Sequence, residues 1–135
     1  MFPSRTISLV IERPCAEVYA FLADPRTLAQ WTEGLLHEPL IALDTWTWTT
    51  AHDGQPVVIH FTPPNQHGVL DIRLDLVDLI ERHYRVRVFT NGTATELCCT
   101  VLQSAGEDDA HFASECEWLR TDLKLLKTFL EARSV

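Results

Sequence analysis

The pattern that most limits the possible folds lies at the C-terminal end of the chain. From Asp108 onward, apolar side chains recur at steps of four and three, at Phe112, Cys116, Leu119, Leu123, Leu126 and Leu130. This spacing predicts one amphipathic helix of roughly seven turns. Its broad apolar stripe needs a large concave partner, which the rest of the chain must supply.

Closely spaced strand patterns fill the middle of the chain. In residues 69–75, VLDIRLD, apolar residues alternate with charged ones, which places them on opposite faces of a strand. The segments between the strands are too short for crossover helices, so we expect an antiparallel meander. The predicted strands are residues 35–42, 44–51, 56–62, 69–77, 84–89 and 94–102.

A strand and two short helices precede this meander. Residues 5–11 alternate as a strand with one buried face, and Arg13-Pro14 ends it. Pro14 suits the first position of a helix over residues 15–23. Asp24 can accept hydrogen bonds from the free amides of a second helix, residues 25–34, which Gly34 can end.

Composition narrows the classes of function. The chain has 135 residues, enough for one domain, and its formal net charge of -8 disfavours binding to nucleic acid or to an anionic membrane surface. The four cysteines lack zinc-site spacing, and no apolar run approaches the ~20 residues of a membrane span. We expect a cytoplasmic protein with reduced thiols, no metal and no cofactor, as a monomer or homodimer.

The order of these elements resembles the START-like, or Bet v 1-like, superfamily, which includes the polyketide cyclase/dehydrase (SRPBCC) proteins. Residues 11–35, IERPCAEVYAFLADPRTLAQWTEGL, are similar to the opening of that family. NQHGVLD and DLKLLKTFLE are similar to segments of an uncharacterised bacterial branch. The resemblance implies a single α+β domain, residues 1–135, with the helix-grip fold, in which a curved antiparallel sheet grips the long C-terminal helix. It also implies a cavity between them that holds apolar small molecules.

Strand periodicity indicates which side chains face this cavity. Even positions of residues 70–74 and 84–88, and odd positions of 97–101, point toward the long helix. The charged residues of these strands face solvent, where opposite charges can pair across strands. The predicted ligand-binding residues are Trp31, Trp46, Trp48, Leu70, Ile72, Leu74, Tyr84, Val86, Cys99, Leu119, Leu123 and Leu126.

Catalytic candidates are weak in this set. General acid–base catalysis needs a titratable group near the reacting atom, and the inward positions are nearly all hydrocarbon. Tyr84 is the best inward polar group, and His67 could border the cavity mouth. The related branch usually carries His at the position of Ile72, which weakens any catalytic role for that strand. The six histidines form no metal motif, and the cysteines have no nearby basic partner.

Three functions remain open on these grounds. The first is binding of a hydrophobic small molecule, such as a lipid, polyketide or aromatic metabolite, without turnover. The second is a cyclase or dehydratase in which the same cavity folds a reactive substrate. The third is a protein-interaction module like the START-like co-chaperones. The scarcity of inward titratable groups favours the first.

Overall fold

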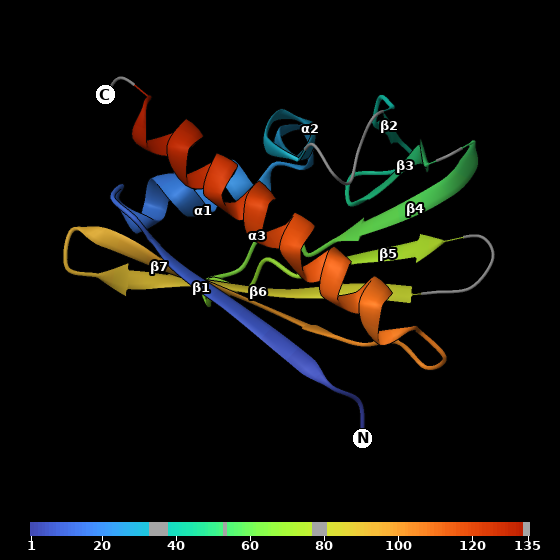
Figure 1. The fold of residues 1–135 in the computed structure, drawn as a ribbon. Helices are drawn as coiled ribbons and strands as arrows, with labels where there is room; N and C mark the ends of the chain where they lie inside the picture. The colour runs from blue at the N-terminus through green and yellow to red at the C-terminus, as the bar shows by residue number, and fades with distance from the viewer. Residues whose placement is uncertain (33–37, 53, 77–80, 134–135) are drawn as a thin grey trace.

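The computed structural model describes residues 1–32, 38–52, 54–76 and 81–133, and these contain one curved antiparallel sheet (Figure 1). The sheet order is β1-β7-β6-β5-β4-β3-β2, a meander closed by the return of β7 to β1. The strands are β1 (Ser4–Ile11), β2 (Ile41–Ala42), β3 (Thr47–His52), β4 (Gln55–Phe61), β5 (Ile72–Leu76), β6 (Glu81–Asn91) and β7 (Ala94–Leu102). The helices are α1 (Cys15–Ala23), the 3-10 turn η1 (Pro25–Thr27), α2 (Leu28–Trp31) and α3 (Asp109–Glu131).

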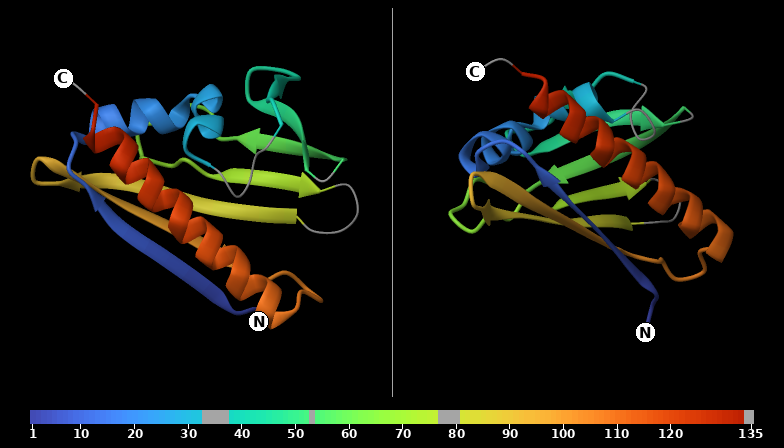
Figure 2. Two further views of the ribbon diagram at one scale, coloured as in Figure 1. Left: turned by 45° about the horizontal axis from the view of Figure 1, so that its top comes forward. Right: turned by 60° about the vertical axis from the view of Figure 1, so that its left-hand side comes forward.

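The long helix α3 crosses one face of the sheet diagonally, as the views in Figures 1 and 2 agree. Its C-terminal end lies beside α1 and α2, and its first turn lies near the end of β7. The two short helices therefore close one end of the space between α3 and the sheet. The predicted helix-grip arrangement is present.

Helix α3 forms where the apolar period predicts it. Asp108 caps its first turn by accepting a hydrogen bond from the Ala110 amide. Leu123, Leu126 and Leu130 are buried against the sheet and the short helices. Each such side chain contributes about 1.5–3 kcal/mol when fully buried, so this stripe holds the helix on the sheet.

The predicted elements are present in the predicted order, but several of their bounds differ from the structure. Side chains explain two of these differences. The strand predicted from residue 44 begins at Thr47, because the Asp44 carboxylate accepts hydrogen bonds from the Trp46 and Thr47 amides and turns the chain. The strand predicted from residue 69 begins at Ile72, because the Val86 amide donates to the Asp71 side chain. The second helix ends at Trp31, before the predicted end at Gly34, and the Thr32 hydroxyl donates to the Leu28 carbonyl there. The described part of the strand predicted over residues 35–42 is a strand only at Ile41–Ala42, because residues 38–40 are not in a strand. Gly34 and residues 35–37 lie outside the described residues.

A tight loop joins β4 to β5 and packs directly on β6. The Asn65 amide group donates to the Val69 carbonyl, and its oxygen accepts from the His67 and Val69 amides. Gly68 has a φ of +68° and lies against the backbone of Val88, whose amide donates to the Gly68 carbonyl. The NQHG residues that carry part of the family resemblance therefore have a structural role here.

A buried ion pair closes the opposite end of the sheet. Arg82 Nη2 lies 2.5 Å from Glu107 Oε2, and both side chains are almost fully enclosed. Arg82 Nη1 donates to the Leu102 carbonyl, and the guanidinium lies over the ring of Phe112. The pair thereby joins β6, the end of β7 and the first turn of α3.

Candidate functional site

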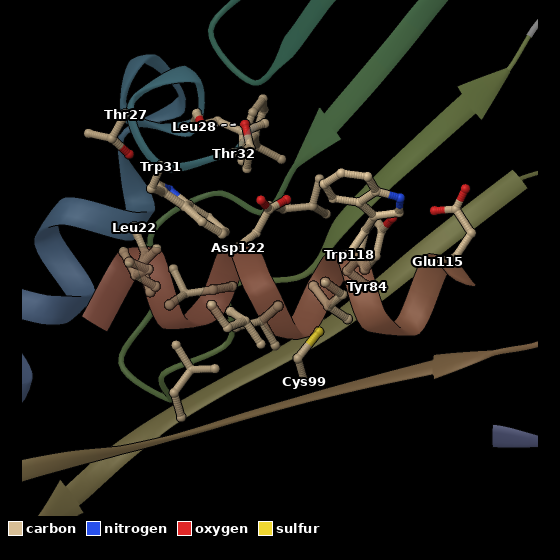
Figure 3. Close-up of a pocket in the computed structure, with 18 residues that line it drawn as sticks. Leu22, Thr27, Leu28, Trp31, Thr32, Tyr84, Cys99, Glu115, Trp118 and Asp122 are labelled. Carbon is tan, nitrogen blue, oxygen red and sulfur yellow. Dashed lines mark hydrogen bonds between the residues drawn. The ribbon is translucent and has the colours of Figure 1, made fainter. Parts of the chain in front are cut away.

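A cavity lies between α3, the inner face of the sheet and the short helices (Figure 3). The centre of a water molecule can occupy about 60 Å³ of it, whereas one water needs roughly 10–15 Å³ on this measure. Including the solvent in its mouth, the hollow has about 810 Å³ free of protein atoms. The two volumes describe the same hollow, and the larger one includes open solvent, so a drug-sized occupant would extend into the mouth.

The structure places nine of the twelve predicted cavity residues in the wall: Trp31, Leu70, Ile72, Tyr84, Val86, Cys99, Leu119, Leu123 and Leu126. Leu74, Trp46 and Trp48 lie elsewhere in the core. Leu74 is fully buried in packing, and the Trp48 indole N–H donates to the Thr45 carbonyl. Leu97, which strand periodicity also placed on the inner face, lies in the wall as well. Leu22, Leu28 and Phe61 complete the apolar wall, and periodicity did not select them.

The wall also contains two carboxylates that are not among the predicted cavity residues. Asp122 is only 5% exposed, and Glu115 lies two turns earlier on the same face of α3. The expectation of an interior nearly free of titratable groups is therefore wrong for α3. The helical spacing of residues 115, 119, 122 and 126 does place them on the face of the apolar stripe, but spacing does not show where packing leaves a cavity.

Tyr84 and Cys99 supply two further polar atoms, and both remain protonated at neutral pH. Burial raises the pKa of Tyr84 above its ordinary value, and the charge of Glu115 adds to this shift. Burial raises the pKa of the Cys99 thiol to about 12. The tyrosine can therefore donate a hydrogen bond inside the cavity, whereas the thiol is a poor nucleophile.

Two tryptophans lie at different depths of the site. Trp31, the last residue of α2, is nine-tenths buried, and its indole N–H has no hydrogen-bond partner among the described residues. Trp118 on α3 is 53% exposed although it lines the cavity, so its ring borders the mouth. Figure 3 shows Trp118 on the same side of the cavity as Glu115.

His67 lies away from this cavity. Its side chain is exposed, and it lines a separate open hollow between α1, the loop 63–68 and β6. Three other histidines lie beside carboxylates: His60 with Asp75, His83 with Asp71, and His111 with Glu107. Of the other two, His37 lies outside the described residues, and the structure places only the strand backbone of His52. In the described ranges, no group of three or more potential ligands is placed to hold a metal ion.

The outer face of the sheet carries the expected pairs of opposite charge. Asp71 forms an ion pair with Arg87 across to β6, and Arg73 Nε lies 3.3 Å from Asp75 Oδ1 on the same strand. These groups point away from α3. They account for the charged half of the alternating pattern without a role in the cavity.

Comparisons with solved structures identify the fold. DynU16, a protein in the dynemicin biosynthetic locus, aligns with a TM-score of 0.73 at 20% identity over 96% of this chain, which covers 47% of DynU16. Ara h 8.0201 aligns with a TM-score of 0.71 at 8% identity, covering 98% of this chain and all of the allergen's chain (100%). CV1439 from Chromobacterium violaceum gives 0.71 at 17% identity, with 96% and 99% covered.

The chain thus spans about half the length of DynU16 and nearly all of the other two. No family model and no curated protein sequence matches it. At these identities the likeness concerns the fold, and the predicted Bet v 1-like helix-grip architecture is confirmed. None of the helices in the described ranges is long and apolar enough to cross a bilayer.

Proposed function

We propose that this protein binds an apolar small molecule in the cavity beneath α3. The observation that carries the proposal is the wall itself, an enclosed hollow of mostly aliphatic and aromatic side chains that opens at Trp118. Each methylene that moves from water into such a wall gains about 0.8 kcal/mol. The fold shared with DynU16 and Ara h 8.0201 supports a ligand-binding or cyclase-type role.

The first test measures binding of an uncharged apolar dye, N-phenyl-1-naphthylamine, whose fluorescence rises in an apolar site. Val86→Phe adds a ring to the cavity wall and should weaken dye binding by at least about tenfold, since the added ring occupies the enclosed space. Val10→Phe is the matched control, because Val10 is an exposed residue on β1. Equal dye affinity in the two variants would overturn the proposal.

A second function, turnover of the cyclase or dehydratase type, is favoured by one specific observation. Asp122 and Tyr84 supply a carboxylate and a protonated hydroxyl to the same apolar space, which is the pairing that acid–base catalysis requires. Because the wall surrounds its occupant, it would also hold a flexible substrate in a folded shape that favours ring closure. The thiol of Cys99 takes no part in this chemistry.

Turnover is tested by incubating the protein with a poly-β-carbonyl thioester and following loss of substrate by mass spectrometry. Asp122→Asn and Tyr84→Phe should each lower the rate by about 100-fold or more if they transfer protons. His67→Ala should leave the rate unchanged, because His67 lines a different hollow. Dye binding without any turnover would leave binding as the function.

A further inference from the structure

All the charged side chains that line the cavity in the described part of the chain are acidic. They are Glu115 and Asp122, and no described lysine, arginine or histidine lines the wall. Arg82, a buried arginine, forms its ion pair with Glu107 at the end of the sheet and does not line the cavity. The formal net charge of the whole chain, which includes these two groups, is -8 and has the same sign.

The mouth combines one of these carboxylates with an aromatic face. Glu115 and Trp118 are three residues apart on α3 and therefore neighbours on its surface. The Trp118 ring is half exposed at the mouth, where an occupant's polar end would lie. A carboxylate beside an indole is a favourable environment for an ammonium group, which gains Coulomb and cation–π attraction together.

We propose that the cavity prefers apolar molecules that end in a protonated amine and discriminates against those that end in a carboxylate. The apolar body occupies the space beneath α3, and the ammonium lies beside Glu115 and Trp118. This inference rests on the proposed binding function and names its ligand class. His111 also faces Glu115, with Nε2 3.6 Å from Oε1, and offsets part of the carboxylate's charge when it is protonated.

Three probes of equal chain length test the preference: n-octylamine, n-octanol and n-octanoate, each titrated against the bound neutral dye in one buffer. Octylamine should bind on the order of tenfold more tightly than octanoate, because one charge is attracted and the other repelled across a few ångströms. Octanol should lie between them, since it shares the apolar gain and carries no charge.

Two charge-neutralising variants locate the effect. Glu115→Gln should reduce the ratio of octylamine to octanoate affinity to about threefold, because it removes the charge that attracts one probe and repels the other. Glu117→Gln removes the same charge from an exposed position of α3 that does not line the cavity, so it should retain most of the ratio. An equal loss in both variants would contradict the placement of the amine beside Glu115.

The outcomes separate the two proposals. If octanol displaces the dye and octanoate binds as tightly as octylamine, the amine preference is overturned while the binding function stands. If neither the dye nor any of the three probes binds, both are overturned. A preference for octylamine that depends on Glu115 supports both.

Discussion

Gly68 shows how a single residue positions the inner face of the sheet. Its φ of +68° is a left-handed conformation, and a Cβ built there would lie 2.2 Å from the Val88 carbonyl oxygen. That oxygen belongs to the backbone of β6, which cannot move without shifting Val86 and Tyr84, both of the cavity wall. The glycine therefore lets the loop pack directly on the strand that forms part of the site.

We predict that Gly68→Ala lowers the free energy of unfolding by at least about 3 kcal/mol, because it adds a backbone clash to the cost of a left-handed alanine. Gly92→Ala is the control. Gly92 has a φ of +60° but nothing within 4 Å of the added methyl, so only about 1–2 kcal/mol should be lost. Urea unfolding of both variants measures the difference. Equal losses would show that the close contact has no energetic effect.

Asp122 illustrates why the chemistry of the site was harder to predict than its shape. Its position, three residues after Leu119 and four before Leu126, places it in the apolar stripe of α3. The helix could be predicted because most positions of this stripe are apolar. That Asp122 lines the cavity could not be predicted, because this depends on where the packing of side chains leaves space. Trp46 and Trp48 show the reverse, because their size suits a cavity wall but the structure packs them elsewhere.

At the scale of elements, Asn65 ties the first helix to the sheet. Its backbone amide donates to the Tyr19 hydroxyl of α1 at 2.8 Å, while its side chain bridges the loop before β5. Since Gly68 follows in the same loop, this bridge fixes how the chain approaches β6. The position of α1 and the start of β5 therefore depend on one loop.

We predict that Asn65→Asp lowers the free energy of unfolding by about 1–2 kcal/mol, because a carboxylate replaces the amide that donates to the Val69 carbonyl. Gln66→Glu makes the same chemical change at the next, exposed position and should change stability by less than about 0.5 kcal/mol. Thermal unfolding checks both variants. If Gln66→Glu loses as much stability as Asn65→Asp, the added negative charge is responsible and not the loss of the hydrogen bond to Val69.

The ends of a strand could be predicted where apolar and polar side chains alternate without interruption. They were harder to predict where a side chain forms a hydrogen bond with the backbone. The predicted bounds of β7 match the structure, since the alternation of residues 94–102 has no interruption. The strand predicted over residues 69–77 begins only at Ile72, because the Asp71 carboxylate accepts the hydrogen bond of the Val86 amide. Val69 still pairs with Arg87 in the register of β5 and β6. Such bonds depend on a partner strand that the sequence pattern does not specify.

For the molecule as a whole, the Arg82–Glu107 pair closes the end of the sheet opposite α2. Burial raises the pKa of Glu107, but hydrogen bonds from Arg82, the Ser104 amide and His111 outweigh it, so the net pKa lies below the ordinary value. A carboxyl whose pKa is lowered by folding stabilises the folded state above its unfolded pKa, about 4.3 for glutamate. That stabilisation is lost as the pH falls through the folded-state pKa.

We therefore predict that Glu107→Gln lowers the free energy of unfolding by about 3–5 kcal/mol at neutral pH, because the buried Arg82 loses its counter-charge. The difference from the unmodified protein should narrow as the pH falls below the unfolded-state pKa of about 4.3 and through the lower folded-state pKa, because Glu107 then becomes protonated. Urea unfolding across a pH series measures this, with the exposed Glu117→Gln as control. A difference that stays constant with pH would mean that shape rather than charge is responsible. If Glu107→Gln does not fold, the double variant Arg82→Met, Glu107→Leu should restore folding by removing both buried charges, and its stability should lack this acid dependence.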